Sequence, residues 1–231
     1  FPSFINAIRQ VNPKIWLFEN VRGMLYSNKW YLDEVIETLQ NEGYIIEYKL
    51  LNAVNYGVPQ NRERVFVIGH KGNFDFPKPE IQKVTAGEAI GDLIETIQDE
   101  SKILTASMDR YVANYEKASS CINPRDLHLH KPARTLTCRN IAAPTGDMQR
   151  VKLKDGRRRR ISVIEAARLQ SFPDWFEFIG TETQQYYQIG NAVPPLLAWH
   201  IANSIKNYLL NDFEPKAFVK KHSQSFQTSL F

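Results

Sequence analysis

Two arginines, Arg62 and Arg64, suggest chemistry by their spacing. They lie in the stretch 51–69, LNAVNYGVPQNRERVFVIG, where an Asn- and Gly-containing loop joins two apolar segments. Side chains two residues apart in an extended chain share a face, so the pair can bind one anion, such as a phosphate or a base edge. A solvated edge pair is the alternative, and it is commoner for an isolated R-x-R. The rigid turn 56–59 and the apolar run 65–68 around the pair favour anion binding.

Glu19 is a second candidate, because it directly follows the apolar run 15–18. Such a run predicts a strand buried on both faces of a sheet, and α/β sheets place their chemistry at the ends of these strands. In a partly dry pocket the pKa of a carboxyl rises, so Glu19 could bind or protonate a ring nitrogen. A helix-capping or ion-paired glutamate is an equally good interpretation from its position alone.

A basic segment spans residues 150–160, where seven Lys or Arg residues stand against one Asp. Asp155-Gly156 predicts a tight hairpin within it. A two-stranded ribbon can enter the major groove of DNA, so with Arg139 nearby we favour nucleic-acid binding over a merely solvated face. The basic positions are Arg150, Lys152, Lys154, Arg157, Arg158, Arg159 and Arg160.

The cysteines and histidines are weaker candidates. Neither Cys121 nor Cys138 has a nearby base in the sequence, so we predict no nucleophile in this chain. Two cysteines make no disulfide framework, which favours a reducing compartment. His128 and His130 have no Cys or acidic partner at a suitable spacing, so we expect a solvated strand and no metal site.

Composition allows one large domain or two small ones, since the chain has 231 residues and 43% hydrophobic content. Its 29 basic and 25 acidic residues give a net charge of +4, distributed unevenly along the chain. No apolar run is long enough to span a membrane, and no signal peptide is visible. The sequence opens on Phe1 inside a helical pattern, so we expect a piece of something larger.

The first 70 residues read as the closing portion of an α/β sheet. Two strands follow one another with no helix between them, which predicts an antiparallel pair. The predicted elements are a helix closed by Pro13, a strand at 15–18, a helix at 31–41 stopped by Gly43, and strands at 44–51 and 64–70.

After residue 71 the patterns become short and weak, and we place a domain boundary at 71–79. The predicted elements there are a short helix at 85–97, strands within 136–160 broken at 144–146 and 155–156, a helix opened by the capping box Ser162–Glu165, an amphipathic helix beginning at Pro195 with Leu197, Ile201, Ile205 and Tyr208 on its apolar face, and a frayed tail at 211–231.

Four blocks of the sequence, in this order, resemble the DNA cytosine-5 methyltransferase family, specifically its carboxyl-terminal portion. They are FENV at 18–21, YGVPQNRER at 56–64, EAARLQSFPD at 165–174 and QIGNAVPP at 188–195. The resemblance covers nearly all of residues 1–210, and four ordered blocks are far more specific than any single motif.

The resemblance implies a catalytic role for residues of the first two blocks. Glu19 looks like the family glutamate that holds a flipped cytosine through N3 and the exocyclic amine, and Asn20 shapes the loop around it. Arg62 and Arg64 look like the pair that contacts the base oxygen and the flanking backbone. Chemistry on a stacked base requires flipping it out, which explains the need for both a pocket and a backbone clamp.

The other blocks imply cofactor and DNA contacts. Residues Asn191, Ala192 and Val193 resemble the block that closes the S-adenosylmethionine pocket. Residues from about 72 to 160 correspond to the variable target-recognition region, in which Thr135-Leu136 resembles a recurrent Thr-Leu pair.

The implied fold class is α/β: the C-terminal part of a mixed Rossmann-like methyltransferase sheet plus a small, mostly β target-recognition domain. The expected division is 1–74 for the end of the catalytic domain, 75–185 for target recognition, 186–212 for a segment returning to the catalytic domain, and 213–231 for a tail.

The family's glycine-rich cofactor loop and its Pro-Cys nucleophile do not occur in this sequence. We therefore expect a part or subunit of a bacterial, cytoplasmic and nucleoid-associated methyltransferase of a restriction–modification system. Its expected partners are double-stranded DNA and a missing amino-terminal half, in the same polypeptide or in a separate subunit. A catalytically inactive, sequence-specific DNA-binding module is the alternative. Glu19, Arg62 and Arg64 favour the enzyme, because a pure binder needs no base-pocket groups.

Overall fold

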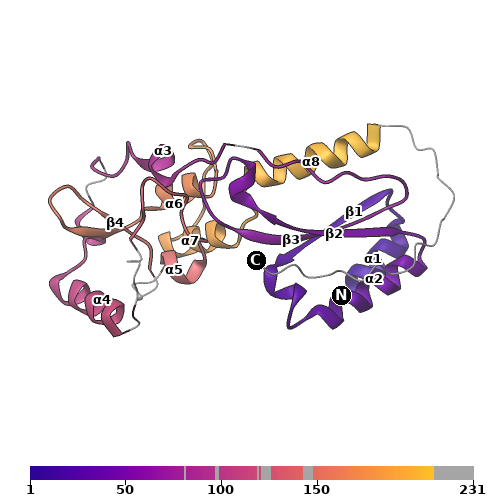
Figure 1. Cartoon of the computed structure of the whole chain (residues 1–231), viewed down its shortest axis with the longest axis horizontal. Helices are drawn as coiled ribbons and strands as arrows, with labels where there is room; N and C mark the ends of the chain where they lie inside the picture. The colour runs from indigo at the N-terminus through magenta and orange to yellow at the C-terminus, as the bar shows by residue number, and fades with distance from the viewer. Residues whose placement is uncertain (81, 97–98, 119, 121–125, 143–147, 211–231) are drawn as a thin grey trace.

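A three-stranded sheet forms the centre of the amino-terminal part of the protein. The computed structural model describes all residues except 81, 97–98, 119, 121–125, 143–147 and 211–231 (Figure 1). The strand order is β1-β3-β2, and both pairs are antiparallel. The strands are β1 (Ile15–Val21), β2 (Ile45–Asn52) and β3 (Glu63–His70). The antiparallel pairing predicted for the second and third strands is thus confirmed.

Helices cover both faces of this sheet, with α8 on one face and α1 and α2 on the other (Figure 1). Because side chains alternate along a strand, β3 sends Val65 and Val67 to the core beneath α1 and α2, and Phe66 to the core beneath α8. The helices are α1 (Pro2–Val11), α2 (Lys29–Asn41) and α8 (Pro195–Leu210), and two 3₁₀ turns are η1 (Arg22–Leu25) and η2 (Ala53–Tyr56).

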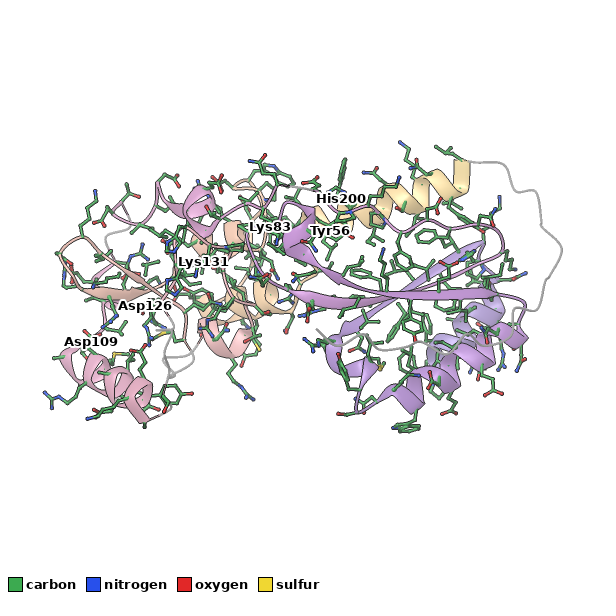
Figure 2. All side chains as sticks on the ribbon, viewed as in Figure 1. Tyr56, Lys83, Asp109, Asp126, Lys131 and His200 are labelled. Atoms are coloured by element: carbon green, nitrogen blue, oxygen red, sulfur yellow. The ribbon has the colours of Figure 1, made fainter. Side chains whose placement is uncertain are left out.

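Helix α8 packs on the sheet at the end of the described chain. Leu197 and Ile201 pack with Phe66, and the hydroxyl of Tyr208 accepts a hydrogen bond from Lys71 N at 3.0 Å. His200 lies against Tyr56 of η2, with ring centroids 5.3 Å apart (Figure 2). The helix therefore joins the last described segment to the sheet.

Strand β1 differs from its prediction in two ways. It was expected to be buried on both faces, but Leu17 and Val21 are exposed. It also continues through Val21, so Glu19 lies within the strand and not after it. Among the described strands β1 pairs only with β3, and its other edge has no partner strand there. An apolar run alone does not distinguish an edge strand from a central one.

The elements between Ala86 and Asn191 pack around a separate apolar core that includes Leu136, Ile161 and Ile189. The expectation that this region is mostly β is wrong for the described residues, where helices predominate. Its elements are α3 (Ala86–Ile90), η3 (Glu100–Lys102), α4 (Ala106–Ala118), α5 (Cys138–Ala142), β4 (Arg150–Lys152), β5 (Arg158–Arg160), α6 (Val163–Leu169) and α7 (Glu182–Asn191).

Within this region, four expectations about local structure have different outcomes. The hairpin at 150–160 is confirmed, with three-residue strands β4 and β5. The capping box Ser162–Glu165 opens α6, also as predicted. Residues 138–142, by contrast, form helix α5 where strands were expected, and the helix predicted for 85–97 ends at Ile90. The breaker at 144–146 and the tail at 213–231 lie outside the described residues.

Candidate active site

Glu19 and Arg64 form an ion pair between neighbouring strands. Val21 pairs with Arg64 in the antiparallel register, and Glu19 stands two residues earlier on the same face of β1. Its Oε1 lies 3.1 Å from Arg64 Nε, with side chains 25% and 13% exposed respectively. Burial raises the pKa of Glu19, against the opposing charges of Arg64 and Arg62. The carboxyl therefore retains a proton at higher pH than an ordinary glutamic acid does.

Arg62 serves a different purpose from Arg64. Its side chain is buried, and its guanidinium donates to three carbonyl oxygens: Leu136 at 2.6 Å, Gly190 at 2.9 Å and Ala192 at 2.9 Å. Burial lowers the pKa of Arg62 to about 9, so the group remains charged at neutral pH. The expectation that Arg62 and Arg64 together present one cationic claw to a ligand is corrected here, because Arg62 cross-links distant backbone segments.

Gln60 and Gln170 extend this buried network, and both were missed as site residues in the sequence. Gln60 Oε1 accepts from Leu136 N at 2.8 Å, and Gln60 Nε2 donates to Gln170 Oε1 at 2.6 Å. Gln170 Nε2 in turn donates to the carbonyls of Ile189 and Ala192 at 2.9 and 3.1 Å. Three of the motif blocks thus meet at one buried point. The sequence signal that could have identified Gln60 and Gln170 was their position inside two of the motif blocks.

The segment around Asn191 approaches helix α5 closely. A Cβ on Gly190 would lie 2.4 Å from the backbone nitrogen of Cys138, so only glycine allows this approach. Ala192 offers its carbonyl to Arg62, Val193 packs against the core beneath α8, and Asn191 is exposed. Ala192 and Val193, two of the three predicted cofactor residues, therefore contact other parts of the protein.

A pocket of about 460 Å³ opens beside Arg64. Val21, Asn52, Asn61 and Thr135 contribute to its lining. Thr135 is fixed there because its hydroxyl donates to the carbonyl of Asn61 at 2.6 Å. The structure thus brings the predicted Thr135 next to Arg64.

Asn20 lies at the same end of β1. Its Oδ1 accepts from Val21 N at 2.7 Å, so the side chain supports the local backbone. This contact fixes the end of the strand next to Val21, which lines the pocket.

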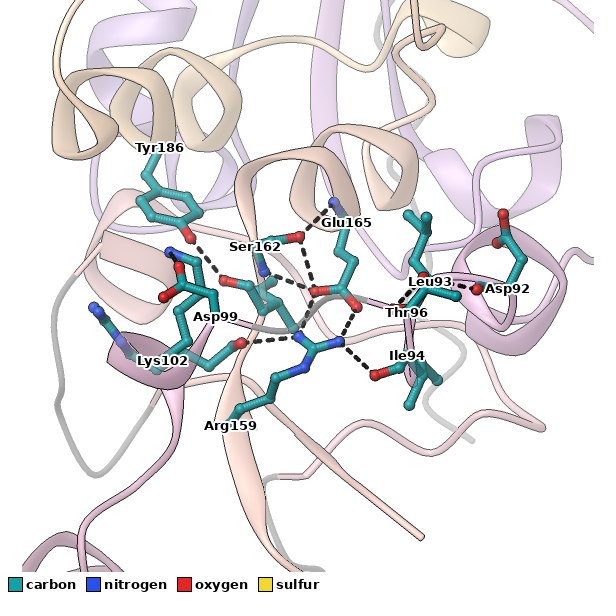
Figure 3. A network of polar contacts seen from close by, with 12 residues as sticks. Asp92, Leu93, Ile94, Thr96, Asp99, Lys102, Arg159, Ser162, Glu165 and Tyr186 are labelled. Carbon is teal, nitrogen blue, oxygen red and sulfur yellow. Dashed lines mark hydrogen bonds and ion pairs between the residues drawn. The ribbon is translucent and has the colours of Figure 1, made fainter.

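The predicted basic hairpin is partly internal. Arg159 is fully buried and forms two 2.7 Å bonds with the carboxylate of Glu165 (Figure 3). Arg150 is also buried, and Asp126, labelled in Figure 2, accepts from both Arg150 and Arg158 at 2.9 and 2.8 Å. The expectation that these arginines face a nucleic acid is therefore wrong for Arg150 and Arg159, whose charges hold the hairpin onto its own domain.

The outward side of the hairpin retains other cations. Lys152, Lys154 and Arg157 are exposed, and so is Arg139 on α5, while Arg160 is half-buried. Arg157 is paired with Asp155 at 2.7 Å. The exposed basic surface is thus made mainly by the two lysines and Arg139.

The structure also locates the cysteine and histidine candidates. Cys138 is a free thiol on α5, whereas Cys121 lies outside the described residues. His128 and His130 are exposed as expected, but they lie in a loop and turn and not in the predicted strand. No group of three metal-ligating side chains occurs among the residues that the structure describes. No helix in that part of the chain is long and apolar enough to cross a membrane.

The α/β fold is similar to that of a solved protein. The solved S. pombe Dnmt2 methyltransferase matches with a TM-score of 0.69, covering 90% of this chain and 72% of its own. Its sequence is 18% identical, so this likeness concerns the fold alone.

Sequence comparison gives the family. The C-5 cytosine-specific DNA methylase family matches residues 1–207, and the chain belongs to that family. It is 54% identical to the Type II methyltransferase M.AplI of Arthrospira platensis, covering 91% of this chain and 61% of the relative. It is 34% identical to the Type II methyltransferase M.BsuRI of Bacillus subtilis, covering 99% of this chain and 58% of the relative. The chain thus spans about three fifths of the length of these two relatives.

Proposed function

We propose that this chain is the carboxyl-terminal part of a DNA cytosine-5 methyltransferase of a restriction–modification system. It supplies base-pocket and DNA-recognition residues for methyl transfer from S-adenosylmethionine to C5 of cytosine in duplex DNA. Family membership and the two Type II relatives support the reaction class. The observation that carries the proposal is the half-buried Glu19–Arg64 pair, held next to a pocket at the end of β1.

Glu19 is the proposed acid of this site. Its raised pKa suits a carboxyl that donates a proton to a ring nitrogen, and Arg64 holds the carboxyl in one orientation at 3.1 Å. A cytosine inside a duplex exposes no ring nitrogen to such a group, so the base must leave the stack first. Arg64 is therefore a positioning residue for Glu19 in this proposal, while Arg62 secures the backbone around both.

The predicted cofactor residues fit S-adenosylmethionine in part. The exposed Asn191 can offer a polar contact and the half-buried Val193 an apolar wall, whereas the carbonyl of Ala192 is already shared by Arg62 and Gln170. We assign Asn191 and Val193 to ligand contact and Ala192 to support. S-adenosylmethionine, when bound, supplies the methyl group.

The exposed basic residues are the proposed DNA contacts. Lys152, Lys154 and Arg139 are exposed and can meet phosphates, and Thr135 lines the pocket beside Arg64. The proposed organisation assigns 1–74 and 186–212 to the catalytic domain and 75–185 to target recognition. The nucleophile belongs to the proposed amino-terminal half, because neither cysteine of this chain has a base beside it in the sequence.

The test combines this chain with that amino-terminal half, in one polypeptide or as two subunits. We expect labelled methyl groups to pass to duplex DNA only when both parts are present. Cys121→Ser and Cys138→Ser should leave the rate nearly unchanged, since neither thiol attacks the base. Duplex binding without any methyl transfer by the combined parts would instead identify an inactive DNA-binding module. A collapse of the rate with either serine variant would contradict the assignment of the nucleophile.

A further inference from the structure

The pocket beside Arg64 is lined by a second arginine. Arg22, in the 3₁₀ turn η1, lines the pocket together with Arg64, and Glu63 is the one carboxylate of the lining. Building on the proposed function, we propose that Arg22 binds a DNA phosphate at this pocket, and that Glu63 occupies Arg22 until the DNA arrives.

Arg22 is held loosely enough to change partner. Its Nη1 lies 2.9 Å from Glu63 Oε2, but the two side chains are 56% and 36% exposed. Ion pairs with this exposure contribute little to stability, because water and salt screen them. The guanidinium also lies over the ring of Tyr26, 5.3 Å from its centroid. That stacking contact keeps Arg22 at the pocket when its carboxylate partner is exchanged for another anion.

Arg64 adds a second positive charge to the pocket lining. It is largely buried, and its charge is opposed by Glu19, which does not line the pocket. The lining itself therefore contains two guanidinium groups and one carboxylate. An arriving phosphate would meet Arg22 and Arg64 on one surface, and guanidinium groups bind phosphate oxygens through paired N–H donors.

Gly23 gives independent support for a ligand at this place. A Cβ on Gly23 would meet only Val21 Cγ2, at 4.0 Å, and its φ lies outside the left-handed region. Neither packing nor backbone conformation therefore requires glycine here, in contrast to Gly190. A glycine that the protein's own packing does not need, at the wall of a cationic pocket, allows close approach of a ligand to the backbone.

A phosphate explains these features better than a base does. Arg22 and Glu63 carry their charges on exposed side chains, whereas base recognition needs fixed donors and acceptors at defined positions. Glu63 then acts as an internal competitor: while it is bound to Arg22, it reduces the attraction of the pocket for any anion. Binding at Arg22 should accordingly be independent of DNA sequence.

The test measures duplex affinity at several salt concentrations in the combined enzyme, using a fluorescent 20-base-pair duplex. Arg22→Gln should weaken binding roughly three- to tenfold and flatten the slope of log affinity against log salt by about one unit. Glu63→Gln should strengthen binding several-fold by the same reasoning. In the double variant Glu63→Gln should bring no gain, because its effect depends on Arg22.

The matched control is the pair Arg9 of α1 and Glu42 after α2, an Arg–Glu contact of 2.6 Å with similar exposure that does not line the pocket. Arg9→Gln and Glu42→Gln should leave the affinity and the slope unchanged. Gly23→Ala should fold with an unaltered melting temperature and yet bind duplex DNA more weakly. All variants should respond equally on target and non-target duplexes.

Two outcomes overturn the inference, and they are distinguishable. If the unaltered enzyme binds and methylates DNA but Arg22→Gln retains its affinity and slope, the phosphate site is wrong and the proposed function stands. An equal gain from Glu63→Gln with and without Arg22 would also reject the exchange of partners. If the unaltered enzyme binds no duplex DNA at any salt concentration, both the proposed function and this inference are rejected.

Discussion

The side-chain amide of Gln60 donates to the side-chain oxygen of Gln170 at 2.6 Å, although 110 residues separate the two. Both side chains are completely buried, and each also bonds backbone atoms of other motif segments. Buried polar groups of this kind are costly to leave without partners. The motif blocks therefore maintain the tertiary structure as well as the chemistry.

Removing either glutamine should destabilise the fold. We expect Gln60→Ala and Gln170→Ala each to lower the free energy of unfolding by roughly 1–3 kcal/mol, because backbone groups are left without their partners. The double variant should cost less than the sum of the two, as neighbouring residues do in a double-mutant cycle. Urea denaturation measures all three. Gln10→Ala, on the exposed side of α1, is the control and should change little. If the losses of unfolding free energy from the two single variants were fully additive in the double variant, the direct contact between Gln60 and Gln170 would be contradicted.

Arg62→Lys separates the structural role of Arg62 from a DNA-binding role. Lysine keeps the charge, but its compact ammonium cannot reproduce the forked hydrogen bonds to Leu136, Gly190 and Ala192. We expect a decrease of roughly 1–3 kcal/mol in unfolding free energy and nearly unchanged duplex affinity at temperatures where the variant is folded. The exposed Arg139→Lys is the control for stability. An unchanged melting temperature with weaker DNA binding would show instead that Arg62 contacts the DNA.

Glu19→Gln tests the proposed acid. The amide keeps the shape but has no proton to give, so single-turnover methyl transfer by the combined enzyme should slow by roughly 10²-fold or more. Since burial raises the pKa of Glu19 above its ordinary 4.5, the unaltered rate should fall as the pH rises through that raised value. The variant should lack this fall. A large decrease in duplex affinity with an unchanged rate would show that Glu19 is structural.

The hairpin should divide into a structural and a DNA-binding side. Arg159→Gln breaks a fully buried ion pair with Glu165 and should cost about 3–5 kcal/mol of stability. Replacing the exposed Lys152 and Lys154 by glutamine should leave the melting temperature unchanged. That double variant should flatten the salt dependence of duplex binding by about one unit of slope for each phosphate that is no longer neutralised. If the lysine variant lost stability and Arg159→Gln lost none, the assignment of the structural and DNA-binding sides would be reversed.

Local patterns predicted much of the fold. The short connection between two apolar segments indicated the antiparallel pair β2–β3, and the capping box and apolar stripe marked the starts of α6 and α8. Helix α4 was missed because Val112 is its one buried residue, which leaves almost no periodic signal. In a helix of this kind, contacts with the rest of the domain outweigh sequence propensity.

Contacts within the site could be predicted from the sequence only where the two residues lie on neighbouring strands. Glu19 and Arg64 meet because their strands pair, and the motif resemblance located both. Arg62 was misassigned because its acceptors at Leu136 and Gly190 lie 74 and 128 residues away, a distance that no local pattern encodes. The hairpin arginines were overcounted for the same reason, since Asp126 stands 24 residues before Arg150.

The return of α8 to the sheet has a consequence for biosynthesis. Tyr208 donates to the carbonyl of Lys14 at 3.3 Å across 194 residues of chain, and Phe66 is covered by Leu197 and Ile201. During translation, β3 emerges from the ribosome long before these residues exist, so one apolar face of the sheet stays open to water. Contacts of such long sequence separation form late and slowly. Until α8 has been synthesised, the apolar face around Phe66 is therefore exposed to other proteins and to aggregation.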